Sequence, residues 1–172
     1  MNAEPSRQFA DLSRDLAFFE LLTGSYARLV GTPLVAEGQG PDWLYNDAPF
    51  AVLAHNTDPD PRFIYANKFA QVCFEYSWEE FIALPSRLSA ESPNRAERQR
   101  LMDAVARNGF MSDYRGLRIS KFGRRFWIEN GVVWQLTDRD GNWQGQAAVF
   151  SSCNDAEVTS ADSLKRYGDR SS

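Results

Sequence analysis

The chain has 172 residues, of which 43% are hydrophobic, and its formal net charge is -4 at pH 7. This length fits one domain with an added helix or tail, and the apolar content suffices for a packed core. An acidic chain offers no general basic surface for nucleic acid, although the arginines between Arg95 and Arg100 leave a local patch open. No apolar run approaches the roughly 20 residues needed to cross a membrane. Because the start also lacks a signal-peptide pattern, we expect a cytoplasmic protein with neither nucleic acid nor membrane among its partners.

Residues 1–31 have the spacing of an N-terminal amphipathic helix, predicted over residues 5–30. Its apolar positions recur every three or four residues and are Phe9, Leu12, Leu16, Phe19, Leu22, Tyr26 and Leu29. Gly31 and Pro33 end the pattern. Such a helix has to bury its apolar stripe, either on its own domain or across the axis of a homodimer, and both arrangements stay open. In either case the predicted contact residues are Phe9, Leu16, Phe19 and Tyr26.

After a linker at 32–40, short helices and strands follow one another. A short helix is predicted at 41–47, followed by a hairpin of two strands at 50–55 and 62–66. The remaining predicted elements are helices at 67–74, 77–83 and 94–108, then strands at 111–120, 124–137 and 143–152. Strands gathered at both ends, with helices between them, are typical of an α+β fold whose antiparallel sheet is covered on one face. Residues 153–172 form a polar tail, expected to be disordered or a frayed helix.

Two of these helices begin with capping signals. The second strand ends at Asn67, whose side chain can accept a hydrogen bond from a free N–H of the next helix's first turn. Ser77 and Glu80 have the spacing of a capping box, which marks another helix start. We therefore expect Asn67 to be mainly structural, holding the helix that carries Cys73 over a pocket.

Several short segments, in this order, resemble the PAS superfamily of sensor domains. They are FIYAN at 63–67, FEYSWEE at 74–80, GRRFW at 123–127 and DGNWQG at 140–145. More narrowly, the chain resembles the MEKHLA domain, a PAS-like branch found in small bacterial proteins and in plant homeodomain–leucine-zipper regulators. That narrower match is carried by LPSRLSAE at 84–91, NRAER at 94–98 and GVVW at 131–134.

The resemblance implies a PAS-like (MEKHLA) domain over 41–152, with a five-stranded antiparallel sheet and helices enclosing a pocket on one face. Domains of this kind sense, bind and dimerise, and are rarely catalytic. We therefore expect a non-catalytic sensory, ligand-binding and protein-interaction module whose output passes to a separate protein. The alternatives are a purely structural dimerisation domain with a filled core, and a small enzyme that uses the same pocket.

The residues disfavour several cofactors that PAS-like domains carry. Covalent flavin attachment uses a Cys in an Asn-Cys-Arg-Phe-type motif, and the nearest stretch here, SPNR at 92–95, has none. Haem ligation usually uses a His on the long helix, and 94–108 contains none. The single His55 is predicted to be a hydrogen-bonded structural residue. Non-covalent flavin or another small molecule stays open, and no cluster of ligands predicts a metal site.

The two cysteines, Cys73 and Cys153, predict no chemistry of their own. Two lone cysteines form neither a disulfide framework nor a CxxC metal site. We interpret Cys73 as a small buried hydrophobe and Cys153 as a thiol at the start of the tail.

The spacing of the last three strands predicts a register. Pairing Ser120 with Arg125 sets apolar residues opposite apolar ones, and pairing Asp138 with Trp143 places Trp134 opposite Ala147. The buried face is then Leu117, Ile119, Phe126, Ile128, Val132, Trp134 and Leu136. The opposite face carries Tyr114, Arg118, Trp127, Val133 and Phe150, and we expect the N-terminal helix to cover it.

This register lines up Arg115, Asn130 and Ser151 across the buried face. A buried polar row needs partners, since each unpaired group costs about 1–3 kcal/mol. One interpretation is a network satisfied by the helices, with Arg87 or Glu91. The other is a ligand pocket beneath the helices of Cys73 and Met102, in which Arg115 binds an anion. The predicted pocket residues are Arg115, Asn130, Ser151, Trp134, Asn67 and Arg87.

Overall fold

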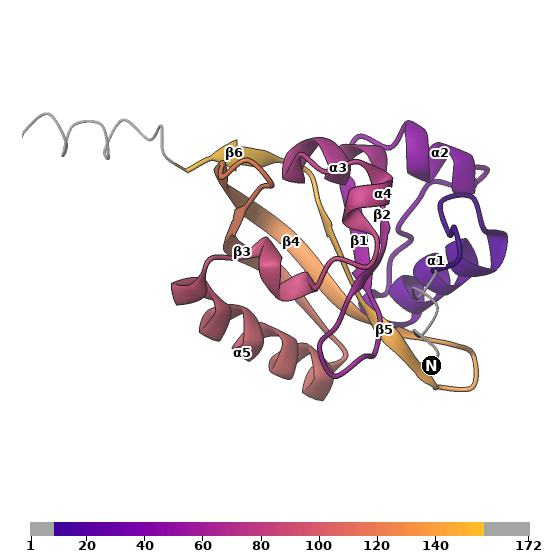
Figure 1. Ribbon diagram of the computed structural model, residues 1–172. Coiled ribbons are helices and arrows are strands. Elements are labelled where there is room, and N and C mark those ends of the chain that lie inside the picture. Colours follow the sequence, from indigo (N-terminus) through magenta and orange to yellow (C-terminus); the bar gives the residue numbers. More distant parts are fainter. Residues whose placement is uncertain (1–8, 157–172) are drawn as a thin grey trace, which may run out of the picture.

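The computed structural model describes residues 9–156 (Figure 1). The helices are α1 (Leu16–Val30), α2 (Pro41–Asn46), α3 (Lys68–Phe74), α4 (Trp78–Phe81), the 3-10 helix η1 (Ser86–Ser89) and α5 (Ser92–Asn108). The strands are β1 (Ala51–His55), β2 (Phe63–Ala66), β3 (Phe110–Ile119), β4 (Arg125–Thr137), β5 (Trp143–Phe150) and β6 (Cys153–Asp155). The α+β class and the order of the predicted elements are confirmed.

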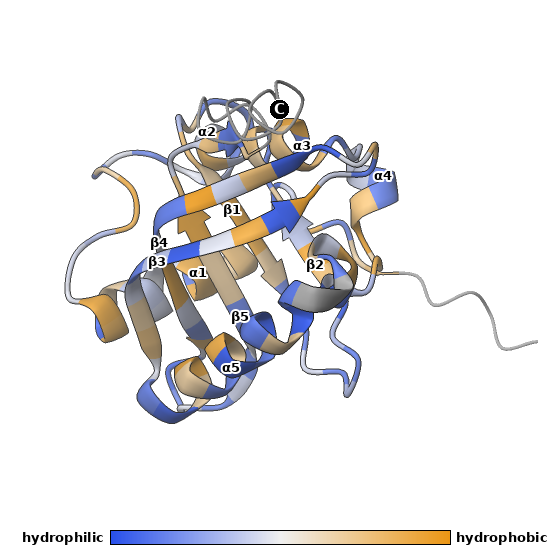
Figure 2. Ribbon diagram, turned by 90° about the vertical axis from the view of Figure 1, so that its left-hand side faces the viewer, coloured by the Kyte–Doolittle hydropathy of each residue, from blue (hydrophilic) through white to orange (hydrophobic). Residues whose placement is uncertain are grey.

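All strand pairs are antiparallel, and the sheet order is β2-β1-β5-β4-β3, with β6 paired to β4. Helices α1 and α5 lie on opposite sides of the long strands β4 and β5 (Figure 1). Helix α5 is mostly hydrophilic, with hydrophobic residues at intervals along it (Figure 2). The sheet is therefore covered on both faces, and each face has its own hydrophobic cluster.

Helix α1 begins at Leu16 because Asp15 caps it. The carboxylate of Asp15 accepts a hydrogen bond from the Ala17 amide, and the helix ends at Gly31 with a φ of 90°. The predicted start at residue 5 is therefore wrong for the part that the structure describes, since residues 9–15 precede the helix. Residues 1–8 of that prediction lie outside the described residues.

The buried side of α1 is made of Phe18, Leu22, Ser25 and Tyr26. Of the predicted contact residues, Tyr26 is buried and Phe19 is half-buried, and both pack in the α1-side cluster. Leu16 is wrong as a sheet contact, because it is 58% exposed. Phe9 precedes the helix and is half-buried.

The β3–β4 register differs by one residue from the predicted one. The hairpin turn has three residues, with Gly123 in the left-handed region (φ 86°), and the Ser120 amide donates to the Arg124 carbonyl. Arg118 therefore pairs with Phe126, and Gly116 pairs with Ile128. This slip brings Tyr114 and Arg118 to the same face as Phe126, where the sequence had placed them opposite.

A bulge at Asn130 then moves the alternation of β4 by one residue. Asn130 has a φ of 54°, a left-handed conformation that Asn tolerates better than most residues, and the β3–β4 ladder is irregular beside it. Before the bulge, Phe126 and Ile128 face α5; after it, Trp134 and Leu136 face α1. The predicted single face running from Phe126 to Leu136 is therefore wrong.

The β4–β5 register is confirmed over most of its length. Val132 pairs with Val149, Trp134 with Ala147 and Leu136 with Gly145, as the small residues opposite the indole predict. A second irregularity follows, so that Thr137 rather than Asp138 pairs with Trp143.

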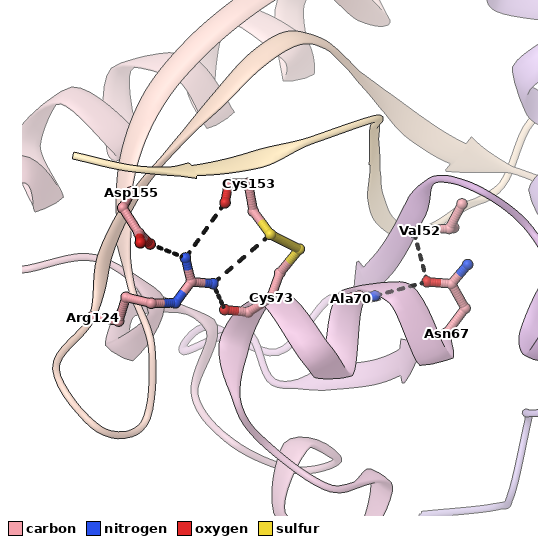
Figure 3. The surroundings of a disulfide bond; sticks show 7 residues. All are labelled: Val52, Asn67, Ala70, Cys73, Arg124, Cys153 and Asp155. Carbon is pink, nitrogen blue, oxygen red and sulfur yellow. Dashed lines mark hydrogen bonds and ion pairs between the residues drawn. A yellow bond between two sulfur atoms is a disulfide. The ribbon is translucent and has the colours of Figure 1, made fainter. Parts of the chain in front are cut away.

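Asn67 is fully buried and joins three parts of the fold. Its side-chain oxygen accepts hydrogen bonds from the Ala70 amide, as the cap of α3, and from the Val52 amide of β1 (Figure 3). Its side-chain nitrogen donates to the carbonyls of Leu44 and Phe50. Four hydrogen bonds from one buried amide account for the structural role predicted for it.

The cysteines form a disulfide, so the prediction of two separate thiols is wrong. Cys73 of α3 and Cys153 of β6 are bonded across a sequence separation of 80 residues (Figure 3). Arg124 reinforces this junction by donating to the Cys73 carbonyl at 2.6 Å and to the Asp155 carboxylate at 2.5 Å. The start of the predicted tail is therefore a strand, and residues 157–172 of that prediction lie outside the described part.

Candidate functional site

The predicted buried row of polar residues is wrong. Arg115, Asn130 and Ser151 are all exposed, because the slipped register and the bulge turn the first two outward and Ser151 follows the end of β5. Arg115 stacks on the Trp127 ring at 3.6 Å and pairs with Glu129 at 3.1 Å. These residues do not come together at a cavity.

The other predicted pocket residues are also elsewhere. Trp134 is buried on the α1 side, where its indole N–H donates to the Ser25 hydroxyl at 3.0 Å and its ring meets Tyr26 edge-on. Arg87 is exposed and pairs with Asp60. Asn67 is occupied by the backbone groups described above.

A cavity of about 70 Å³ lies instead between α5 and the sheet. Met102 of α5 and Phe74 of α3, the helix that carries Cys73, both line this cavity, although it is not the predicted one. Its apolar wall includes Leu53, Phe63, Phe74, Leu101, Met102, Ile128 and Val133. The described residues that line it include no carboxylate.

Arg98 of α5 supplies a buried cation to this cavity. The side chain is on the same stripe as Leu101 and Val105, only 8% exposed, and it donates to the Ser86 hydroxyl at 2.5 Å. Burial, followed by the nearby charge of Arg118, lowers the pKa of Arg98 to about 10. The guanidinium therefore stays charged at neutral pH.

Arg118 of β3 supplies a second buried cation and is 6% exposed. Its guanidinium donates to the Tyr114 hydroxyl at 2.5 Å and to the Leu117 carbonyl at 2.8 Å. Gly116 lies between Tyr114 and Arg118, and a Cβ there would come within 2.1 Å of the Tyr114 hydroxyl oxygen. The missing side chain thus lets the Tyr114 ring lie along the strand and reach Arg118.

We call Arg98, Tyr114 and Arg118 the arginine corner of the cavity. Its nearest ion-pairing carboxylate among the described residues is Glu97, at 3.9 Å from Arg118 and 40% exposed. Burial raises the pKa of Tyr114, so the phenol is neutral at physiological pH. The corner therefore carries two buried positive charges, and the carboxylates that act on them, Glu97 on Arg118 and Asp60 on Arg98, are both half-exposed.

His55 and Gln146 form a neutral polar part of the same lining. Burial lowers the pKa of His55 to about 4, and its Nδ1 lies 3.0 Å from the Asn56 carbonyl. His55 is therefore uncharged at neutral pH and hydrogen-bonded, in agreement with the structural role predicted for it. Gln146 lies 3.4 Å from Gln135, which also accepts from the Trp143 indole.

Sequence reasoning missed the arginine corner, although one signal was present. Arg98, Leu101, Met102 and Val105 have the i, i+3, i+4, i+7 spacing of a single helix face, so a charged residue interrupts an apolar stripe. Such a position predicts a buried cation that needs a partner. Arg118 carried no comparable signal, because its face depends on the turn at Gly123.

Within residues 9–156, no group of three or more His, Cys, Asp or Glu side chains could hold a metal ion. None of the helices that the structure describes is long and apolar enough to pass through a membrane.

Comparison with known proteins supports the fold and the family. A family model described as the MEKHLA domain matches residues 16–154. No curated protein matches the chain significantly. A PAS domain from Colwellia psychrerythraea superposes with a TM-score of 0.52 at 18% identity, covering 61% of this chain and 86% of that one.

Two light-oxygen-voltage structures are also similar. One, from a study of a flavin analogue and domain mechanism, has a TM-score of 0.51 at 15% identity and covers 71% of this chain and 88% of its own. The other, an RNA-binding light-oxygen-voltage receptor, has a TM-score of 0.57 at 20% identity. The similar region covers 82% of this chain and 41% of the receptor chain. At these identities the likeness shows the fold alone.

Proposed function

The chain belongs to the MEKHLA domain family, a PAS-like class of sensory signalling module, and on that basis we propose that it senses a small molecule bound beneath α5. The observation that carries this proposal is the cavity of about 70 Å³ on the α5 side of the sheet. The α1 side, by contrast, is filled by Trp134 and its aromatic neighbours.

The size of the cavity limits the ligand. Sites for drug-sized molecules have volumes of about 300–1,000 Å³, so a flavin would need α5 to move outward. A ligand of a few atoms fits without such a movement. The ligand sensed is therefore small, and non-covalent flavin is the less favoured of the two possibilities.

The proposed role is binding without catalysis. The described lining residues include no carboxylate and no cysteine, and His55 is neutral with one ring nitrogen beside a backbone carbonyl. A general acid–base mechanism needs a titratable group poised near the working pH and within reach of a substrate. His55, with its pKa near 4, does not meet that requirement at neutral pH.

Occupancy of the cavity has a direct route to the rest of the fold. Glu91, which precedes α5, pairs with Arg125 of β4 at 2.5 Å, and β4 passes beneath both α5 and α1. A ligand that fixes α5 would therefore also bias β4 and the surface that it supports. A separate output protein would read that surface.

Two further expectations remain predictions. Homodimerisation through α1 has to use residues such as the exposed Leu16, because the buried stripe of α1 already packs on its own sheet. Sedimentation of the full chain tests it. The Cys73–Cys153 disulfide argues against the expected cytoplasmic location, because such bonds are rare in reducing compartments.

The proposal is tested by hydrogen exchange with a set of small molecules of about four to six non-hydrogen atoms, including neutral, anionic and cationic members. At least one member should slow amide exchange in α5 and β4 of the full chain. Met102→Trp, which fills the cavity, should abolish that protection, whereas Ala106→Trp on the exposed side of α5 should keep it. If no member protects α5 in the unmodified chain, the sensing role is wrong.

A further inference from the structure

We infer that the cavity takes a short aliphatic monocarboxylate, whose charged end contacts Arg98 and Arg118 and whose tail lies among the apolar side chains of α5 and the sheet. This inference rests on the proposed function, because it names the ligand class of the same cavity.

The first step is the charge that the arginine corner lacks. Arg98 is 8% exposed, and its guanidinium donates a hydrogen bond to the neutral hydroxyl of Ser86. The ion pairs among the described residues include none for Arg98, and the carboxylate whose charge acts on it, Asp60, is 46% exposed and pairs with Arg87 instead. Buried charged side chains are normally paired, because an uncompensated charge away from water is costly. A bound anion would supply the missing partner.

The second step is the closeness of the two cations. Both guanidinium groups belong to the lining of one cavity, and the charge of Arg118 contributes to the lowered pKa of Arg98, as expected for like charges that lie near each other. The one carboxylate in ion-pair range of Arg118, Glu97, is 40% exposed and therefore a weakened partner. An anion between the two guanidinium groups would reduce the repulsion and satisfy both.

The third step is the shape of the anion. A guanidinium presents a planar fork of N–H donors that matches a planar carboxylate in a bidentate contact. Tyr114 and Ser86 hold the two forks through hydrogen bonds of 2.5 Å each. Their arginines are therefore oriented before a ligand arrives, which lowers the entropic cost of binding.

The fourth step is the tail. The rest of the cavity wall is formed by aliphatic and aromatic side chains, among them Leu53, Phe63, Leu101 and Val133. An apolar cavity of about 150 Å³ holds the six non-hydrogen atoms of benzene, so about 70 Å³ has room for roughly three. Propionate has a single charge and an apolar end, and its three carbons match this volume when its carboxylate oxygens lie against the guanidinium groups of the arginine corner.

The experiment is a calorimetric titration of the full chain with sodium propionate, propionamide and sodium nitrate. Propionamide keeps the shape and removes the charge, whereas nitrate keeps the planar charge and removes the tail. We expect propionate to bind at least about tenfold more tightly than either, since it alone satisfies both ends of the cavity. Equal binding of propionamide would overturn the carboxylate inference and leave the sensing role standing; equal binding of nitrate would overturn the role of the tail. Failure of all three in titration, with no α5 protection by any small molecule, would remove both proposals.

Variants locate the site. Arg98→Met should weaken propionate binding about 100-fold while keeping the length of the side chain, and Arg100→Met, an exposed arginine on the same helix, should leave it unchanged. Arg118→Lys keeps the charge, loses the fork and should have an intermediate effect. Propionate affinity that is unchanged in both Arg98→Met and Arg118→Lys would contradict the assignment, and Arg118→Lys keeps this test decisive if Arg98→Met does not fold.

Discussion

The two faces of the sheet are built from the same strands but are packed differently. On the α1 side, Trp134 is fully buried, its N–H is bonded to Ser25 and its ring packs on Tyr26. On the α5 side, an equally apolar cluster surrounds two buried arginines and leaves a cavity. One face is therefore a filled core, and the other keeps space beside two buried charges.

Strand β4 serves both faces because of the bulge at Asn130. Its first half sends Phe126 and Ile128 toward α5, and its second half sends Trp134 and Leu136 toward α1. A regular strand would have placed all four on one side. One non-glycine residue with positive φ thus decides which face of the sheet each half of β4 packs against.

The largest expected effect concerns the closed face. Trp134→Ala should lower the free energy of unfolding by about 3–5 kcal/mol, because a fully buried indole is replaced by a void and the Ser25 hydroxyl loses its donor. The matched control is Trp143→Ala, which removes an indole that is 53% exposed and should cost below about 1 kcal/mol. Urea denaturation measures both, and similar losses in the two variants would refute the account of a closed α1 face.

The disulfide should have the next largest effect. Reduction opens the link between α3 and β6, and a disulfide typically contributes about 2–4 kcal/mol to stability. Unfolding with and without reductant should differ by that amount in the unmodified chain. Cys153→Ser should show the reduced stability under both conditions; a variant that still responds to reductant would mean that another reaction is being observed.

The pH dependence of the open face is smaller and has a defined sign. His55 has a pKa of about 4 in the folded chain against about 6.5 when unfolded, so the unfolded state binds more protons between these values. Stability should therefore be complete above about pH 6.5 and decrease as the pH falls toward about 4. Between about pH 7 and about pH 5 the loss from His55 is about 2 kcal/mol.

His55→Gln is the matched variant for this measurement, because the amide does not titrate. The unfolding free energy of the unmodified chain minus that of His55→Gln should decrease as the pH falls, because only the unmodified chain loses stability through this residue. If the two chains show parallel pH profiles, His55 is not buried as a neutral group.

The fold could be predicted largely from sequence because its signals are local. The cap at Asn67, the capping box at Ser77 and the small residues opposite Trp134 each report on residues that are near in sequence or directly paired. The family segments set the order of the remaining elements, and the family match confirms them.

The part of the candidate site on the sheet could not be predicted, because it depends on two backbone details. The three-residue turn at Gly123 and the bulge at Asn130 each move the side-chain alternation by one, and a single step exchanges the faces of a strand. As a result, Arg115 is exposed although it was predicted to be buried, and Arg118 lies in the lining of the cavity. The Cys73–Cys153 bond was missed because the two residues are 80 apart, a separation that no local pattern reports.

The most direct test of the contrast between the two faces is a two-dimensional NMR titration of the isotope-labelled full chain with sodium propionate. The account predicts shifts of the backbone amides around Arg98, Tyr114 and Arg118, with the indole N–H signal of Trp134 unchanged. A Trp134 signal that moves as much as those amides, or a spectrum that does not change at all, would contradict it.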